Sequence, residues 1–256
     1  MKIRAAFFSN TGMVRTRNED GLLLDRQMIA GTSMSSPVYT EVPGTSHILV
    51  VSDGLGGHAG GQTATKAVLE TFKRNGNRLV HDRSLLNVIG SCKTALNRIV
   101  RNGRGLLGLG ATTAGIVIGN GHGITVFNCG DCRVYRLSGG DFKRITRDHS
   151  FVQQLFEQGE ITEEAMKFHA RKNLVTSALV GDLDRKVPEF FSRKVPVSRG
   201  DRFLICSDGV WESMDTAELA GIIGGDTVQK AANVLVRKVM ENGASDNYTF
   251  IIAEIQ

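Results

Sequence analysis

Two segments of the chain repeat one layout, and this repetition constrains the fold more than any other feature of the sequence. Residues 48–61 read ILVVSDGLGGHAGG, and residues 203–212 read FLICSDGVWE. In both, an apolar run typical of a buried strand leads into Ser-Asp-Gly. A rigid strand end holds a side chain in place while its polar atoms reach solvent or a ligand. The repeat therefore predicts that Asp53 and Asp208 converge if their strands are neighbours.

A third acid, Asp246, opens the last predicted strand in the segment ASDNYTF. Three converging carboxylates cannot all stay ionised unless a cation compensates their charge. Ligation by oxygen alone favours Mg²⁺ or Mn²⁺ over Zn²⁺. The alternative is that each Asp-Gly pair is an ordinary turn after a strand. That alternative explains one copy well, but two copies together with Asp246 favour a metal site.

Glycines fill the segment after Asp53 and leave room for a ligand close to the backbone. The carbonyl of Gly54 can itself bind a metal. The segment does not match a phosphate-binding P-loop, because no Gly-Lys-Ser/Thr follows. The motif CGDC at 129–132 has the spacing of a zinc ligand pair but lacks a second pair, so we interpret its cysteines as small strand residues.

Strands and helices come in runs along the chain rather than in strict alternation, which indicates an α+β fold. Residues 26–46 hold two of the four prolines and predict a surface loop. No linker interrupts the pattern, so we expect one domain over residues 1–256. The pattern predicts a helix after the glycines that follow Asp53, helices at 83–102, 149–158, 162–168 and 227–241, strands at 3–9, 20–25, 47–53, 201–207 and 247–255, and an antiparallel meander over 108–138.

Composition narrows the classes of partner. The net charge is +5 and the basic residues are scattered, which gives no support to a nucleic-acid groove. Four cysteines in 256 residues do not indicate a disulfide scaffold. The first residues lack the apolar core of a signal peptide, and no apolar run approaches the ~18 residues of a membrane span. We expect a cytoplasmic monomer that binds neither nucleic acid nor membrane.

Seven motifs in a fixed order resemble one known family over essentially the whole chain. Together they are similar to the metal-dependent Ser/Thr protein phosphatases of type 2C, in their compact bacterial form. The resemblance implies a four-layer α-β-β-α sandwich, with two antiparallel sheets between helix pairs and two Mn²⁺ or Mg²⁺ ions at one edge. The motifs are GMVRTRNED (12–20), VVSDGLGGHAGG (50–61), GLGATT (108–113), NCGDCRVYRL (128–137), ITRDHSFVQQLFEQGEIT (145–162), LICSDGVWE (204–212) and SDNYT (245–249).

The same resemblance implies roles for the acids. Asp53 is similar to the carboxylate that bridges both metal ions, and Gly54 to the residue whose carbonyl binds one of them. Asp208 and Asp246 resemble the remaining direct ligands of the other ion.

The resemblance also covers acids outside the repeated layout. Glu19 and Asp20 resemble the acids that hold water around the second ion, and which of the two binds that ion directly stays open. Asp131 is similar to the residue that binds a weaker third ion together with Asp208.

Two further side chains match family residues that act on the phosphate. Arg15 resembles the phosphate-binding arginine, whose planar fork can grip two oxygens. Taken alone, an arginine in a polar loop is usually solvated, and we interpret Arg17 in this way. His58 resembles the proposed general acid, which gives a proton to the departing Ser or Thr oxygen. Without the resemblance, the sequence predicts only that His58 is an exposed histidine in a loop.

The resemblance implies phosphoprotein substrates, including a partner Ser/Thr kinase. Residues 148–180 correspond to the variable flap of the family, beside the site. Two other functions stay open at this stage. One is a catalytically silent relative that binds phosphoproteins, which the intact set of acids disfavours. The other is a metal phosphodiesterase or nuclease with the same acids, which the weak basic patches and the motif order disfavour.

Overall fold

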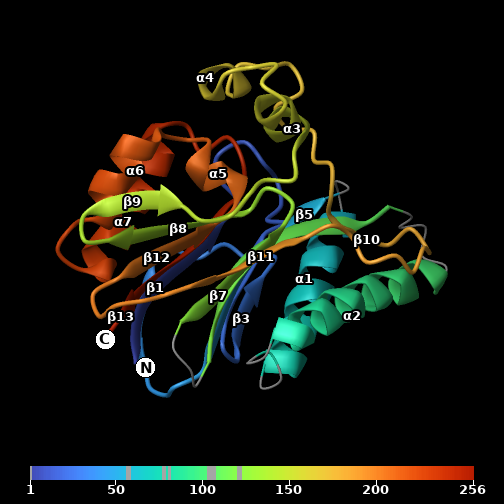
Figure 1. The fold of residues 1–256 in the computed structure, drawn as a ribbon, viewed down its shortest axis with the longest axis horizontal. Coiled ribbons are helices and arrows are strands. Elements are labelled where there is room, and N and C mark those ends of the chain that lie inside the picture. Colours follow the sequence, from blue (N-terminus) through green and yellow to red (C-terminus); the bar gives the residue numbers. More distant parts are fainter. Residues whose placement is uncertain (1, 56–58, 77–78, 80–81, 103–107, 120–122) are drawn as a thin grey trace.

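Two antiparallel sheets form the middle of the molecule, with helices on both outer faces (Figure 1). The computed structural model describes residues 2–55, 59–76, 79, 82–102, 108–119 and 123–256. One sheet has the order β4 (Val38–Val42), β1 (Ile3–Asn10), β13 (Tyr248–Ile255), β12 (Arg202–Cys206), β8 (Arg133–Ser138) and β9 (Asp141–Arg144). The other has the order β11 (Phe191–Val195), β7 (Ile124–Cys129), β6 (Gly110–Ile118), β5 (His47–Leu55), β2 (Gly21–Leu24) and β3 (Gln27–Ala30), and β10 (Leu179–Val180) pairs with β6.

Alternation along the strands explains the layers, because successive side chains of a strand point to opposite faces. Leu22 and Leu24 lie in the core between the sheets, whereas Leu23 packs in the core under the helices. Helices α1 (Ala59–Asn75) and α2 (Asp82–Arg101) cover the seven-stranded sheet, and α5 (Asp208–Trp211), α6 (Thr216–Ile223) and α7 (Val228–Glu241) cover the six-stranded sheet (Figure 1). The predicted α+β, four-layer α-β-β-α sandwich is confirmed.

Helices α3 (Phe151–Glu157) and α4 (Glu163–Met166) stand apart from the two sheets, at the top of Figure 1. Thr162 caps α4, since its side chain accepts a hydrogen bond from the backbone N–H of Ala165. This cap agrees with the helix start predicted from the sequence.

Two predictions about the strands were wrong. Residues 26–46 are more than a loop, because they contain β3 and β4, which are edge strands with partly exposed, polar sequences. Residues 108–138 do not form one meander: β6 pairs with β7, but the chain then crosses to the other sheet, where β8 pairs with β12 and β9. Asp131 lies at this crossing, between the ends of β7 and β8.

None of the helices in the described ranges combines the length and the apolar character that a membrane span requires.

Candidate metal centre

The two Ser-Asp-Gly copies have the same sequence but different local structures. Asp53 lies inside β5, where it pairs with Thr112 of β6, and the strand continues to Leu55. The predicted strand end at Asp53 is therefore two residues early. Asp208 follows β12 and is the first residue of the short helix α5, with Ser207 at the N-cap. One copy thus presents its carboxylate from a strand and the other from a helix start.

Asp20 is fully buried and is tied to the second copy. Its Oδ2 accepts a hydrogen bond of 2.7 Å from the Oγ of Ser207. The same Oγ accepts from the backbone N–H of Thr249 at 3.0 Å. The other oxygen of Asp20, Oδ1, is buried without a hydrogen-bond partner in the part of the chain that the structure describes. A buried carboxylate oxygen in that state is an acceptor that a cation can satisfy.

Arg15 reaches the same place from the N-terminal loop. Its Nη2 donates to Asp246 Oδ2 at 2.7 Å, and the two side chains are 58% and 35% exposed. The hydrogen bond to Asp246 raises the pKa of Arg15 most, and the charges of Asp208 and Asp53 raise it further. A guanidinium that keeps half of its surface exposed beside these acids can also contact a ligand.

Asn247 fixes this loop to the start of β13. Its Oδ1 accepts from the backbone N–H of Glu19 at 2.7 Å, and its Nδ2 donates to the carbonyls of Thr11 and Arg17, both at 2.9 Å. Sequence reasoning missed the roles of Asn247 and Ser207. Both stand inside the motifs that had been singled out, directly beside an aspartate, and this adjacency was the available signal.

Glu19 lies against the start of α1, where glycine makes room for it. A Cβ on Gly61 would stand 2.2 Å from Glu19 Oε2 and 2.9 Å from the carbonyl oxygen of Gly54. A Cβ on Gly54 would stand 2.4 Å from the backbone of Gly61. Any side chain at either position would displace the carboxylate or the backbone, so both glycines are needed for this approach.

Burial and mutual repulsion dominate the electrostatics of the acids. Burial raises the pKa of Asp53 and of Asp208 far above their usual range, and the charges of neighbouring carboxylates raise both further. Burial also raises the pKa of Asp20 and of Asp131 to about 6. Asp246 acts on Asp53, Asp20 and Asp208 through its charge. The structure therefore brings five of the predicted acids within electrostatic range of one another.

Asp131 is held by a stacked arginine and tryptophan. Its carbonyl oxygen accepts from Trp211 Nε1 at 3.1 Å, and the guanidinium carbon of Arg133 lies 3.3 Å from the centre of the Trp211 ring. Arg133 also donates to Asp148 at 2.6 Å. This contact links the helix that begins with Asp208 to the crossing at Asp131 and to the beginning of the 148–180 segment.

The CGDC motif behaves as small core residues. Cys129 and Cys132 are both free and buried. Burial raises the pKa of the Cys129 thiol to about 12 and raises that of Cys132 well above its usual range. A thiol that is so hard to ionise is a poor metal ligand.

His58 lies outside the described residues. Within the described ranges, no three carboxylate, thiol or imidazole side chains stand close enough around one point to enclose an ion by themselves. Mg²⁺ and Mn²⁺ sites commonly keep several waters and use one or two carboxylates, so few protein ligands are needed for each ion.

The donor set fits a divalent cation with oxygen ligands. It consists of repelling carboxylates with raised pKa values, one unpartnered carboxylate oxygen and the half-buried carbonyl of Gly54. A cation relieves both the repulsion and the unpaired acceptor.

Comparison with known proteins identifies the family. The model of the protein phosphatase 2C family matches residues 14–248. The chain belongs to the protein phosphatase 2C family. The match covers the N-terminal loop, both Ser-Asp-Gly segments and the start of β13.

Several serine/threonine protein phosphatases are similar to the chain. The serine/threonine protein phosphatase PstP of Mycobacterium tuberculosis (strain CDC 1551 / Oshkosh) is 27% identical over 259 residues, which cover 99% of this chain and 45% of PstP. The chain thus spans less than half of the length of that relative. The serine/threonine phosphatase stp of Listeria innocua is 27% identical over 260 residues, which cover 98% of this chain and 96% of stp.

A solved structure of this family shows a metal-bound state. It is a crystal structure of the catalytic domain of PstP in complex with two manganese ions. It superposes with a TM-score of 0.79 at 25% sequence identity and covers all of both chains.

Proposed function

We propose that this chain is a metal-dependent protein phosphatase that hydrolyses phosphoserine and phosphothreonine monoesters. The observation that carries the proposal is the set of mutually repelling, at least partly buried acids at Asp53, Asp208 and Asp246, with Arg15 beside them. Family membership and the manganese-bound PstP catalytic domain support the same reading.

The residues that would hold two Mn²⁺ or Mg²⁺ ions come from the predicted set. Asp53 would bridge both ions, with the Gly54 carbonyl on one of them and Asp208 and Asp246 on the other. When bound, the ions supply an activated water for in-line attack on phosphorus and offset the charge of the phosphoryl oxygens.

Three further acids, Glu19, Asp20 and Asp131, would complete the metal centre. Glu19 and Asp20 would hold water around the second ion. The unpartnered Oδ1 of Asp20 and the contact of Glu19 with Gly61 support this assignment. Asp131 would bind a weaker third ion together with Asp208, and the charge of Asp131 acts strongly on Asp208.

Arg15 and His58 would act on the substrate. Arg15 is paired with Asp246 in this structure. A bound phosphoryl group competes for its guanidinium, whose planar fork fits two phosphate oxygens. His58 would give a proton to the Ser or Thr oxygen as it leaves, because an alkoxide is a poor leaving group.

We also propose that residues 1–256 form one catalytic domain of a cytoplasmic monomer, and that its substrates include a partner Ser/Thr kinase. Residues 148–180 would act as the flap that selects substrates. The position of α3 and α4 outside the sheets and the 88% exposure of Phe168 support this role (Figure 1).

The experiment is Mn²⁺-dependent release of phosphate from a phosphothreonine peptide. We expect turnover by the wild type, loss of turnover in EDTA, and loss of turnover in Asp208→Ala. The matched control is Asp141→Ala, which removes an exposed aspartate at the start of β9. Peptide binding without EDTA-sensitive turnover would indicate a silent relative. Hydrolysis of phosphodiesters but not monoesters would indicate a nuclease-like enzyme.

A further inference from the structure

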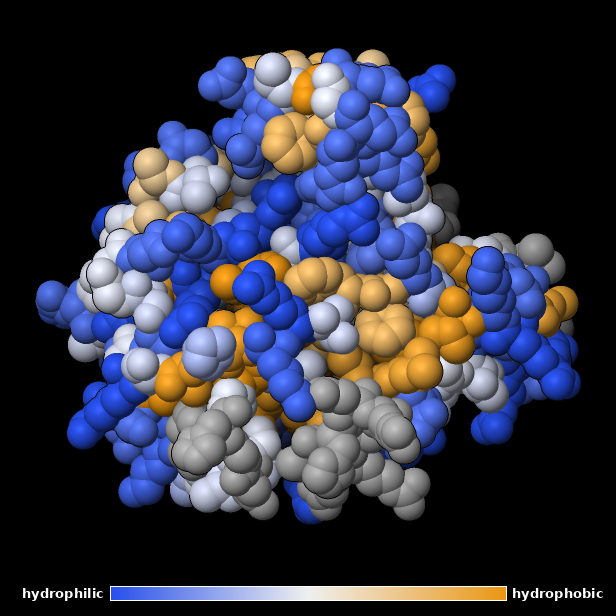
Figure 2. All heavy atoms as spheres, in the orientation of Figure 1, coloured by the Kyte–Doolittle hydropathy of each residue, from blue (hydrophilic) through white to orange (hydrophobic). Residues whose placement is uncertain are grey.

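A basic pocket lies at the C-terminal end of α2, away from the acids. Its volume is about 450 Å³, and it lies between α2 and the segment 181–187 that follows β10. Figure 2 shows hydrophilic side chains over this projecting end of α2, at the right of the view. The lining residues are Lys93, Thr94, Asn97, Arg98, Arg101, Asn102 and Arg185, and none of them is acidic.

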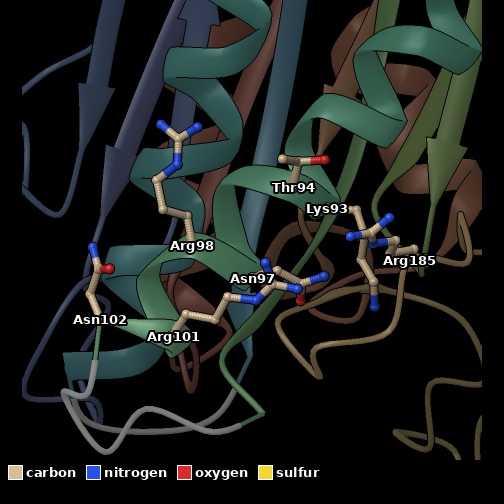
Figure 3. Close-up of a pocket in the computed structure, with 7 residues that line it drawn as sticks. All are labelled: Lys93, Thr94, Asn97, Arg98, Arg101, Asn102 and Arg185. Carbon is tan, nitrogen blue, oxygen red and sulfur yellow. The ribbon is translucent and has the colours of Figure 1, made fainter.

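The cationic side chains converge from two parts of the chain. Figure 3 shows the side chain of Arg101 extending from the end of α2 toward Asn97. Lys93 and Arg185 lie beside them in the same view, whereas Arg98 points away. The dipole of α2 favours basic residues in its last turn, where Arg98 and Arg101 lie. The helix dipole does not explain why Arg185, which belongs to a different segment, also lies at the pocket.

The frame of the pocket is built by hydrogen bonds between α2 and residues 180–184. Lys93 has a side chain that is only 6% exposed, and its Nζ donates to the carbonyl of Val180 at 2.8 Å and to the carboxylate of Asp182. Asn97 accepts from the backbone N–H of Leu183 at 3.0 Å and donates to the carbonyl of Asp184 at 2.5 Å. A ligand would therefore meet a wall that is already ordered.

The acids near the pocket are already engaged, which leaves its arginines uncompensated. Asp182 accepts from Lys93 and from the backbone N–H of Asp184. Asp184 accepts from two backbone N–H groups of its own turn. In the described part of the chain, no carboxylate pairs with Arg101 or Arg185. The pocket thus offers two exposed guanidinium groups to an anion.

The sheet connects this pocket to the candidate metal centre. Asp53 pairs with Thr112 of β6, and Val180 pairs with Gly110 of the same strand. Strands lie about 4.8 Å apart and rise about 3.3 Å per residue, so the backbones of Asp53 and Val180 are about 12 Å apart. The carbonyl of Val180 is the one that binds Lys93. An extended peptide of a few residues spans this distance.

We propose that the basic pocket binds a second phosphoryl group of the same protein substrate. The proposal rests on the proposed phosphatase function, because it places one phosphorylated residue at the acids and another at the pocket. Two guanidinium forks match the dianionic oxygens of a phosphate better than they match a single carboxylate. An extended chain advances about 3.3 Å per residue, so the two phosphorylated residues would stand about four to eight positions apart.

The first test compares peptides with one and two phosphothreonines, with Mn²⁺ present. For the wild type we expect a second phosphate at the right spacing to raise kcat/KM about tenfold through a lower KM. The double variant R101E/R185E loses this gain and keeps its kcat/KM on the singly phosphorylated peptide. The control R193E reverses one charge of the same kind on exposed β11 and keeps the gain. An equal gain in the double variant and the wild type would overturn the proposal.

A binding measurement separates this proposal from the proposed activity. Fluorescence anisotropy of a doubly phosphorylated peptide is followed on Asp208→Ala, with and without R101E/R185E. We expect the pocket changes to weaken binding at least fivefold even if no peptide is ever hydrolysed. If inorganic phosphate competes at the pocket but a second phosphate never improves peptide binding or turnover, the pocket is a site for small free anions and the proposal fails.

Discussion

The candidate metal centre and the basic pocket both adjoin the seven-stranded sheet and carry opposite charges, but they differ in how far their charged groups are buried. The centre holds Asp20 without any exposed surface, beside Asp53 and Asp208, and repulsion there drives pKa values up. The pocket presents Arg101 and Arg185 to solvent. Charges in a buried site interact strongly, whereas exposed charges are screened by water and salt. The centre should therefore depend absolutely on cations, and the pocket should only adjust affinity.

Among the single substitutions in the metal centre, we expect Asp53→Ala to reduce the activity most. We expect kcat/KM for a phosphothreonine peptide to fall roughly a thousandfold, because the lost carboxylate is one on which the charges of four other acids act. Steady-state kinetics at saturating Mn²⁺ measure the effect. A fall of less than tenfold, with the variant folded, would show that Asp53 does not organise the site.

The metal-free protein should become less stable as pH rises. The pKa values of Asp20 and Asp131 are raised to about 6 in the folded chain, so the folded state holds protons that the unfolded state has already lost. The free energy of unfolding then falls between about pH 4 and pH 6, by about 3 kcal/mol for each group. Urea unfolding of EDTA-treated protein at several pH values measures this fall in the free energy of unfolding.

Two variants control that measurement. Asp20→Asn should flatten part of the slope, whereas R101E in the basic pocket should leave it unchanged. Stability that instead rises with pH over this window would contradict the repulsion in the centre.

Arg15 should matter less than the acids. We expect Arg15→Ala to lower kcat/KM about a hundredfold, and Arg15→Lys to recover part of the loss, since lysine offers a point charge rather than a planar fork. The control is Arg17→Ala, which removes an exposed arginine from the same loop. Equal losses at both positions would indicate a general effect of loop charge.

The smallest expected effect is on salt dependence. Raising NaCl from 0.05 to 0.5 M should remove most of the tenfold preference for doubly phosphorylated peptides, because exposed charges are screened. The requirement for Mn²⁺ should persist in the same buffers. A preference that survives high salt would mean that the second phosphate binds in a buried place, and not in the pocket.

The sequence revealed the parts of the fold with strong apolar periodicity. Helices α2 and α7 and the central strands follow such runs, and the repeated Ser-Asp-Gly indicated where the acids meet. Strands β3 and β4 were not predicted, because edge strands are partly polar and this region contains prolines. The crossing between the sheets at Asp131 was not predicted, because a Gly-Asp pair is equally typical of a turn within one sheet.

The basic pocket could not be predicted from the sequence. Lys93 and Arg101 read as ordinary exposed positions of an amphipathic helix, and Arg185 lies far away along the chain. The fold brings these residues together, in part through the hydrogen bonds of Lys93 and Asn97 to residues 180–184.

The most direct test of the metal centre is a calorimetric titration of EDTA-treated protein with Mn²⁺ at pH 7, followed by thermal unfolding. The account predicts that two ions bind to the wild type and raise its melting temperature, and that Asp246→Ala loses at least one of them. A folded wild-type chain that takes up no Mn²⁺, with an unchanged melting temperature, would contradict it.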